Sequence, residues 1–257
     1  MKGWITSLLL QLQFLTRIPI PGRISYDEQL LVRGFVFAPL IGLLTGLLTA
    51  GTGWLVSLLG QRVLTVAAVL TVEILVTGAL HLDGFADTCD GLGSSRPVDR
   101  ALEIMKDSRT GVFGVTGIVL LLLCKAALLY ALPVAGFYSW LICMPVISRF
   151  NAVLMAGVSG YAGRERGLGA AYCEQTGPGR MIAAGVSCAL FCLPLTGFRF
   201  PLPAMLTAVW TLWFCRRLKQ RLGGITGDTI GYAIEMSEVL FLAAAVVQAA
   251  LLTGLEF

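Results

Sequence analysis

Long apolar runs with almost no charge restrict this chain more than any other feature of its sequence. About 20 consecutive apolar residues cross the hydrocarbon core of a bilayer as a helix, which satisfies its own backbone polar groups there. We predict such spans at residues 34–59, 63–80, 112–133, 138–158, 181–198, 203–215 and 239–255. The expected fold class is therefore all-α, a polytopic integral membrane protein with about seven transmembrane helices.

Two apolar segments are too short for an ordinary span. The segment 203–215 has 13 residues, so we expect it to begin earlier in the chain or to be re-entrant. The segment Trp4–Leu15 is expected to lie at the membrane surface as an interfacial helix. No repeat or linker divides the chain, which predicts a single membrane-embedded domain over residues 1–257.

Basic residues collect in four segments and predict the orientation. Fifteen of the 19 Lys and Arg residues lie in segments 1–33, 81–111, 159–180 and 216–238, whereas the opposite loops hold only Arg62 and Arg199. Cytoplasmic loops carry an excess of positive charge. We therefore expect the N-terminus and the four charged segments in the cytoplasm, and the C-terminus outside. The net charge of +4 requires no nucleic-acid partner, because the basic residues border spans.

Acidic residues concentrate in the second of these segments. Six of the 15 acids lie between positions 83 and 107, and Asp83, Asp87 and Asp90 have the spacing i, i+4, i+7. This spacing places three carboxylates on one face of a helix, where they repel one another unless a cation lies among them. Mg²⁺ prefers such hard oxygen ligands, usually together with substrate phosphates. The pattern predicts metal-assisted phosphoryl chemistry at the cytoplasmic face.

A glycine-rich turn at 223–228 precedes a further acidic group, Asp228, Glu235 and Glu238. Its glycines expose backbone N–H groups that suit an anion, and Asp228 is placed either to cap a helix or to bind a metal.

Ionisable residues also lie within the predicted spans, where they are costly and usually face a partner or a cavity. The sequence leaves open whether Glu73 acts in function or pairs with Lys125 or Arg149. Arg149 is also a candidate for a phosphate contact.

These polar segments match the pattern of a known family over nearly the whole chain. The matching motifs are FLTRIPIP at 14–21, HLDGFAD at 81–87 followed by TCDGL, LEIMKDSRTGVFG at 102–114, ISRF at 147–150, GLG at 167–169 and GGITGD at 223–228. The chain resembles the cobalamin synthase family, also called adenosylcobinamide-GDP ribazoletransferases. Two departures are Phe85, where the family typically has Leu, and Tyr232, where it usually has a small residue.

The resemblance implies an enzyme of the bacterial cytoplasmic (inner) membrane whose active site faces the cytoplasm. Members join adenosylcobinamide-GDP to α-ribazole, or to its 5′-phosphate, and release GMP, with Mg²⁺ as the cofactor. The ribazole hydroxyl attacks the phosphorus attached to cobinamide. In such transfers a protein mainly positions the reacting groups and neutralises charge.

On this basis we assign roles to individual residues as expectations. Asp83, Asp87 and Asp90 are expected to bind the metal, and one of them to take the hydroxyl proton. Asp228 is a further metal ligand candidate and Asp107 a further catalytic candidate. The candidates for substrate binding are His81, Lys106, Arg109, Arg149, Gly227, Glu235 and Glu238, with Lys106 and Arg109 placed on the diphosphate.

Two alternative functions remain at this stage. A CDP-alcohol phosphatidyltransferase also has aspartates in a DG-rich run, but its pattern places Arg after Ala where this chain has Asp87 after Ala86. A transporter would use Glu73, Lys125 and Arg149 as pathway residues. Against a transporter, the acids gather at one membrane face. The sequence leaves open the number of metal ions, the preference for ribazole or its phosphate, and whether the protein forms a homo-oligomer.

Overall fold

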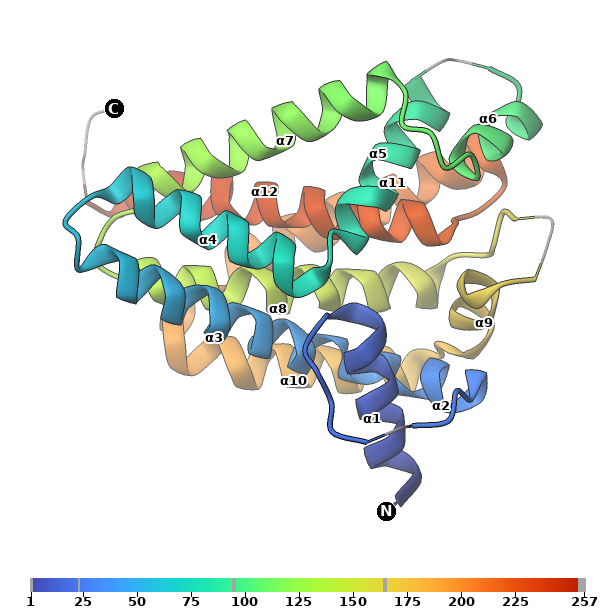
Figure 1. The fold of residues 1–257 in the computed structure, drawn as a ribbon, viewed down its shortest axis with the longest axis horizontal. Helices are drawn as coiled ribbons and strands as arrows, with labels where there is room; N and C mark the ends of the chain where they lie inside the picture. Colours follow the sequence, from blue (N-terminus) through green and yellow to red (C-terminus); the bar gives the residue numbers. More distant parts are fainter. Residues whose placement is uncertain (1, 23, 94–95, 164–165, 254–257) are drawn as a thin grey trace.

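The computed structural model describes residues 2–22, 24–93, 96–163 and 166–253 as an elongated bundle of helices (Figure 1). The elements are α1 (Lys2–Leu15), α2 (Glu28–Arg33), η1 (Gly34–Phe37), α3 (Ala38–Ser57), α4 (Arg62–Thr77), α5 (Leu80–Gly93), α6 (Val98–Met105), α7 (Val112–Ala131), α8 (Phe137–Val158), α9 (Leu168–Gln175), α10 (Pro178–Thr196), η2 (Gly197–Arg199), α11 (Pro201–Leu222) and α12 (Gly227–Thr253). The predicted all-α class is confirmed.

Helices suited to a membrane make up most of the bundle. Within the described residues, five stretches are long and apolar enough to cross a bilayer: Glu28–Ser57, Val112–Ala131, Phe137–Val158, Pro178–Arg199 and Gly227–Leu252. A sixth is counted if α4 and α5 are taken together as one bent pair. The predicted short segment 203–215 is part of the 22-residue helix α11, which does not qualify because its C-terminal half is basic. The predicted count of about seven is therefore five or six by length and composition.

Helix α8 is the centre of the bundle and is buried along nearly its whole length. It packs against α3, α10, α11 and α12. Small residues on α3 allow close packing, since a Cβ on Gly42 would lie 2.2 Å from the carbonyl oxygen of Pro145. Gly46 meets the same helix at Ile142. Close backbone approach through small residues is a common way for membrane helices to associate.

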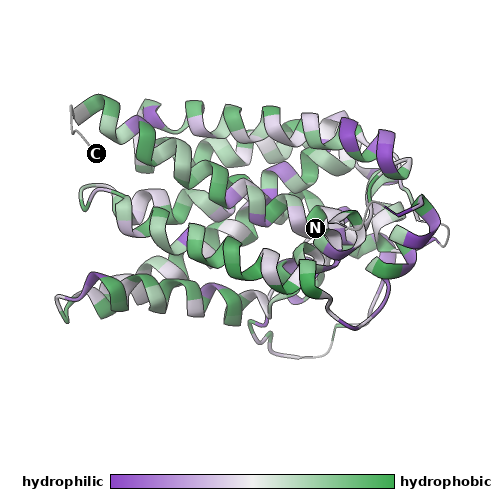
Figure 2. Cartoon of the chain, turned by 90° about the horizontal axis from the view of Figure 1, so that it is seen from above, coloured by the Kyte–Doolittle hydropathy of each residue, from purple (hydrophilic) through white to green (hydrophobic). Residues whose placement is uncertain are grey.

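The polar residues gather at one end of the bundle, and the other end is mainly apolar (Figure 2). Figure 1 places the short helices α2, α6 and α9 together with α5 at that polar end, and the C-terminus at the opposite end. Helix α1 lies across the long axis and is a short apolar helix, as expected for an interfacial segment. The described parts of the motif-bearing segments, 81–93, 96–111, 160–163, 166–170 and 223–228, therefore meet in one region.

A sharp bend separates α4 from α5 and directs the acidic helix. Gly78 and Ala79 both have left-handed backbone conformations, with φ of 62° and 58°, and the two helices lie at 89° to each other. Glycine adopts this conformation without strain, whereas alanine pays a steric cost. The predicted span 63–80 therefore ends at Thr77, and α5 turns across the polar end to pack on α12, α7 and α6.

Candidate active site

The three aspartates predicted to share a helical face lie on α5, but their environments differ. Asp83 is exposed, Asp87 is half-buried and Asp90 is buried. The carboxylate of Asp90 accepts hydrogen bonds from the backbone N–H groups of Gly111 at 2.7 Å and Gly114 at 2.9 Å. Both oxygens of Asp90 therefore hold the first turn of α7. Asp90 was expected to bind the metal with Asp83, and in the structure its carboxylate accepts these two backbone hydrogen bonds instead of facing Asp83 alone.

A different aspartate, Asp228 at the start of α12, comes next to Asp83. Helices α5 and α12 approach closely because glycines face each other. A Cβ on Gly84 would lie 2.9 Å from the carbonyl oxygen of Asp228, and one on Gly231 would lie 3.3 Å from the Cα of Gly84. The charge of Asp87 interacts with those of Asp83 and Asp228. Three carboxylates from two helices thus share this region.

The glycine-rich turn before α12 is anchored by backbone contacts. Ile225 forms a bridge with the 160–162 segment, donating from its N–H to Gly160 at 2.9 Å and accepting from the N–H of Ala162 at 2.9 Å. Thr226 and Thr229 exchange side-chain and backbone hydrogen bonds at the start of the helix. Thr226 therefore caps α12, and Asp228 is left to face a cavity.

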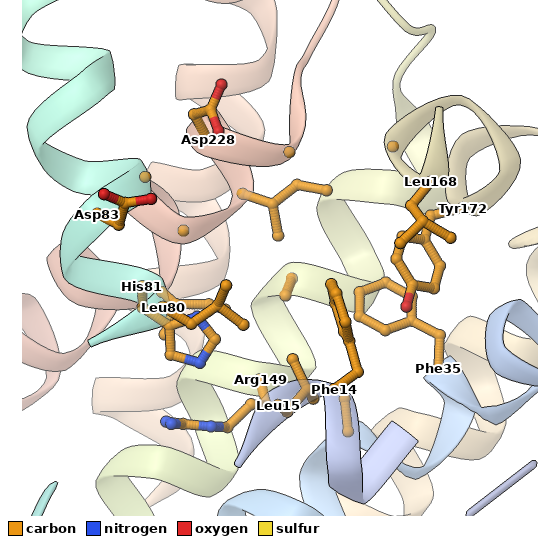
Figure 3. Close-up of a pocket in the computed structure, with 18 residues that line it drawn as sticks. Phe14, Leu15, Phe35, Leu80, His81, Asp83, Arg149, Leu168, Tyr172 and Asp228 are labelled. Atoms are coloured by element: carbon orange, nitrogen blue, oxygen red, sulfur yellow. The ribbon is translucent and has the colours of Figure 1, made fainter. Parts of the chain in front are cut away.

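This cavity is lined by residues of α1, η1, α3, α5, α8, α9 and α12 (Figure 3). Its polar side carries Asp83 and His81 from α5, Asp228 from α12 and Arg149 from α8. Most of the remaining lining is apolar, with residues from α1, η1, α9 and α12. The structure therefore combines an apolar chamber with carboxylates at one edge.

A second cavity adjoins the first, because Gly169, Gly227 and Asp228 line both. Its lining is more polar and includes Glu103 and Lys106 from the α6 region. A Cβ added at Gly227 would meet no atom within 4 Å, so the backbone there is open to the cavities. Lys106 and Gly227, both expected in substrate binding, thus lie at this second chamber.

Asp107 and Arg109 form a surface ion pair. Their side chains are 39% and 87% exposed, and the carboxylate oxygen lies 2.8 Å from the guanidinium nitrogen. Hydrogen bonding to Arg109 lowers the pKa of Asp107 to about 2. Neither residue lines the two cavities described above. The structure therefore does not bring the predicted catalytic Asp107 to Asp83.

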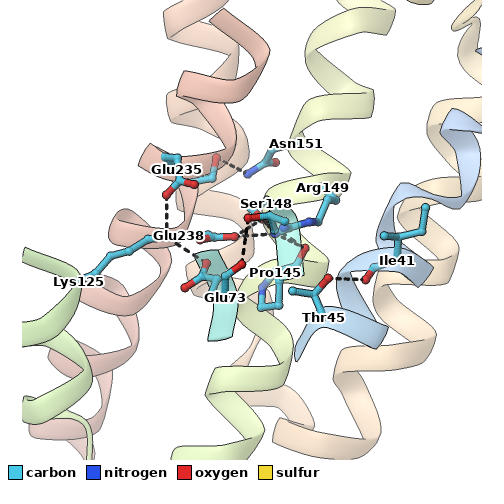
Figure 4. A network of polar contacts seen from close by, with 12 residues as sticks. Ile41, Thr45, Glu73, Lys125, Pro145, Ser148, Arg149, Asn151, Glu235 and Glu238 are labelled. Carbon is cyan, nitrogen blue, oxygen red and sulfur yellow. Dashed lines mark hydrogen bonds and ion pairs between the residues drawn. The ribbon is translucent and has the colours of Figure 1, made fainter. Parts of the chain in front are cut away.

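A buried ion cluster lies deeper in the bundle (Figure 4). The ammonium of Lys125 on α7 contacts Glu73 on α4 at 3.1 Å, Glu235 on α12 at 2.7 Å, and Glu238 on α12. Arg149 on α8 lies 2.6 Å from Glu238. All five side chains are at most 8% exposed. Glu73, for which the sequence left function or pairing open, is thus paired with Lys125 in the structure.

Glu235 and Glu238, which were expected to bind substrate, belong to this buried ion cluster. Neither lines the cavities, and both carboxylates are engaged by cations, with Ser148 donating a further hydrogen bond to Glu238 at 2.9 Å. Arg149 belongs both to the ion cluster, through its contact with Glu238, and to the lining of the first cavity. The sequence signal for this cluster was the presence of Lys125 and Glu73 within apolar spans.

Two buried nitrogen atoms at the first cavity lack hydrogen-bond partners within the described residues. They are Nε2 of His81 and Nε of Arg149, on side chains that are 4% and 1% exposed. Buried polar atoms are rarely left unpaired, since this costs about 1–3 kcal/mol. These two atoms are therefore positions where a further polar group, from water or from a ligand, would complete a hydrogen bond.

Sequence reasoning missed the aromatic wall of this cavity. Phe35 and Tyr172 lie with ring centroids 4.3 Å apart, and Phe14 lies 6.4 Å from Tyr172. They come from η1, α9 and α1, and no spacing links them. The two residues that depart from the family pattern contact each other, because Phe85 stacks on Tyr232 with ring centroids 4.7 Å apart and an interplanar angle of 6°.

Among the residues that the structure describes, no three His, Cys, Asp or Glu side chains are arranged to hold a metal ion on their own. Asp83 and Asp228 nevertheless face one cavity. Mg²⁺ commonly takes one or two protein carboxylates and completes its shell with water and substrate phosphates. The donor chemistry present therefore fits Mg²⁺ bound together with a phosphate group.

Comparison with known proteins gives a consistent result. A model of the cobalamin-5-phosphate synthase family matches residues 7–246. The chain is 39% identical over 240 residues to the adenosylcobinamide-GDP ribazoletransferase of Syntrophobacter fumaroxidans, covering 91% of this chain and 95% of that protein. It is 34% identical over 238 residues to the enzyme of that name from Clostridium novyi, covering 93% and 95%. No solved structure matches significantly.

Proposed function

The chain belongs to the cobalamin-5-phosphate synthase family, and we propose that it joins adenosylcobinamide-GDP to α-ribazole, or to its 5′-phosphate, with release of GMP. The names of its relatives support this reaction, and neither a CDP-alcohol phosphatidyltransferase nor a transporter is favoured. The structural observation that carries the proposal is the pair of cavities that meet at Asp228, beside Asp83.

Two adjoining cavities suit a reaction between two substrates. The oxygen of the ribazole hydroxyl forms a bond to the phosphorus attached to cobinamide, while the bond from that phosphorus to the bridging oxygen breaks. GMP leaves with the electron pair of that bond and the other phosphate. The hydroxyl proton passes to a carboxylate, and we assign this role to Asp83 because it lies at the edge of the apolar cavity. Lys106, at the second cavity, is assigned to the diphosphate.

Mg²⁺ is part of this proposal. Asp83 and Asp228, with Asp87 beside them, would hold the ion together with phosphate oxygens of the substrate. When bound, the ion neutralises charge on the diphosphate. Metal binding can be measured without turnover, since saturating Mg²⁺ stabilises the folded protein by about 2.7 kcal/mol at a hundredfold excess over the dissociation constant. The shift should be much smaller in Asp228→Asn, and equal shifts would exclude Asp228 as a ligand.

The reaction itself is tested with purified protein, adenosylcobinamide-GDP, α-ribazole and Mg²⁺, by following GMP and the corrinoid product. Asp83→Asn should lower the rate by about 10²–10⁴, as expected for loss of a base or a metal ligand. Asp27→Asn is the matched control, because Asp27 caps α2 and Asn caps equally well. Near-normal turnover by Asp83→Asn would remove Asp83 from the mechanism. Release of CMP from a CDP-alcohol, or solute uptake without conversion, would favour the alternatives.

We also propose that the polar end faces the cytoplasm in the inner membrane, on the basis of the distribution of basic residues. A reporter inserted near Arg96 should be active inside the cell and a C-terminal reporter outside it. A cytoplasmic C-terminus would mean that α11, the least apolar of the long helices, does not cross the membrane.

A further inference from the structure

The lining of the first, apolar cavity indicates which part of a substrate binds there, and this inference rests on the proposed function. We propose that this cavity binds the benzimidazole base of ribazole, with Nε2 of His81 donating a hydrogen bond to the free ring nitrogen of that base. The second, more polar cavity is then left for the nucleotide diphosphate of the other substrate.

The wall of the cavity fits a flat aromatic base. Phe14, Phe35 and Tyr172 form one side, and aliphatic residues such as Leu80 and Ile234 line other parts (Figure 3). The hydroxyl of Tyr172 donates to Gln11 at 3.1 Å, which holds the ring in position. Aromatic rings add favourable stacking energy to the burial of apolar area. A ligand here is therefore expected to present an apolar aromatic face.

The unpaired nitrogen of His81 selects among aromatic ligands. A neutral imidazole carries its proton on one of two nitrogens, so a ligand that offers a lone pair to Nε2 favours the tautomer with the proton there. Dimethylbenzimidazole joined to ribose has one ring nitrogen free to accept a hydrogen bond and no donor on the ring. Guanine has several donors and acceptors on its edges, and most of this apolar lining offers them no partner. The cavity thus matches benzimidazole better than guanine.

The position of the cavity agrees with this choice. Asp228 lies where the two cavities meet, Asp83 lines the first cavity on the same side, and His81 and Arg149 lie farther from Asp228 (Figure 3). A base seated against His81 directs its ribose toward the carboxylates. The ribose hydroxyl would then meet the diphosphate at the junction of the cavities. On this assignment the corrin ring of the other substrate lies outside this chamber.

The experiment compares α-ribazole with an analogue in which CH replaces the free ring nitrogen, an indole riboside. With adenosylcobinamide-GDP saturating, kcat/KM for α-ribazole should exceed that for the analogue by about tenfold in the wild type, the size of one hydrogen bond to a buried group. His81→Leu should abolish this preference by lowering kcat/KM for α-ribazole alone. The KM for adenosylcobinamide-GDP should stay unchanged.

A second variant locates the base independently of His81, in case His81→Leu does not fold. Phe14→Leu removes an aromatic wall residue while keeping apolar volume, and it should raise the KM for both ribosides severalfold and equally. Equal use of the two ribosides by the wild type would overturn the assignment to His81. An effect of Phe14→Leu on the KM for adenosylcobinamide-GDP would assign the cavity to that substrate. In both cases GMP release by the wild type would leave the proposed function standing, whereas its absence would contradict that function.

Discussion

Replacing Lys125 by Met should strongly destabilise the protein, because Lys125 neutralises acids from two other helices. The variant keeps most of the length of the side chain, so the main change is the loss of one buried positive charge. Glu238 retains Arg149 at 2.6 Å, whereas Glu73 and Glu235 lose the cation that lies 3.1 and 2.7 Å away. Removing one partner of a buried ion pair costs about 3–5 kcal/mol. That is a large fraction of a typical folding free energy of about 5–15 kcal/mol.

The measurement is an unfolding titration of detergent-solubilised protein, followed by tryptophan fluorescence. The double variant Lys125→Met/Glu235→Gln returns the net formal charge of the cluster to its wild-type value, because one cation and one carboxylate are removed together. It should regain about half of the lost stability. Lys219→Met, at an exposed position on α11, serves as a control for general effects of losing a lysine. A free energy of unfolding for Lys125→Met within about 1 kcal/mol of the wild type would refute the view that these acids depend on Lys125.

Three further changes test other contacts by the same titration. Asp90→Ala leaves two backbone N–H groups at the start of α7 without their acceptor, which should lower the free energy of unfolding by about 1–3 kcal/mol. An unchanged free energy of unfolding would show that water replaces the carboxylate. Ala79→Gly should stabilise the protein by about 0.5–1 kcal/mol, because glycine adopts the backbone angle φ of 58° without strain. Destabilisation would mean that the packing of the Ala79 methyl group contributes more than this strain costs. Tyr172→Phe removes the hydrogen bond to Gln11 but keeps the ring contact with Phe35, so it should lower the free energy of unfolding by about 1 kcal/mol. A larger loss of stability would indicate that the ring contact is disturbed too.

Apolar runs predicted most of the bundle because membrane helices are local structures. The expected segments 112–133 and 138–158 correspond to α7 and α8 within two residues at each end. The end of α4 was missed by three residues, because the left-handed pair Gly78 and Ala79 depends on packing against Arg17 as well as on local sequence. Helix α11 extends past the apolar segment 203–215 because its basic half is still a good helix former.

The sequence indicated which residues lie near the site better than it indicated which of their side chains contact one another. Helical spacing grouped Asp83, Asp87 and Asp90 correctly on α5, but spacing alone does not reveal that α7 begins beside Asp90. The partners of Glu235 and Glu238 lie on α7 and α8, far away in the sequence. Such contacts follow from the packing of whole helices, which periodicity in one segment does not report.

The buried ion cluster has a consequence for the order in which the chain is assembled during synthesis. Lys125 enters the membrane with α7 before its partners on α12 exist, since Glu235 and Glu238 follow 110 and 113 residues later. At about 5–20 residues per second, translation needs roughly 5–20 s to reach them. Glu73 is made 52 residues earlier and is the one acid of the cluster already inserted when α7 arrives. We therefore expect Glu73 to be the counter-ion of Lys125 in the nascent protein, which would hold α4 and α7 together until the last helix is added.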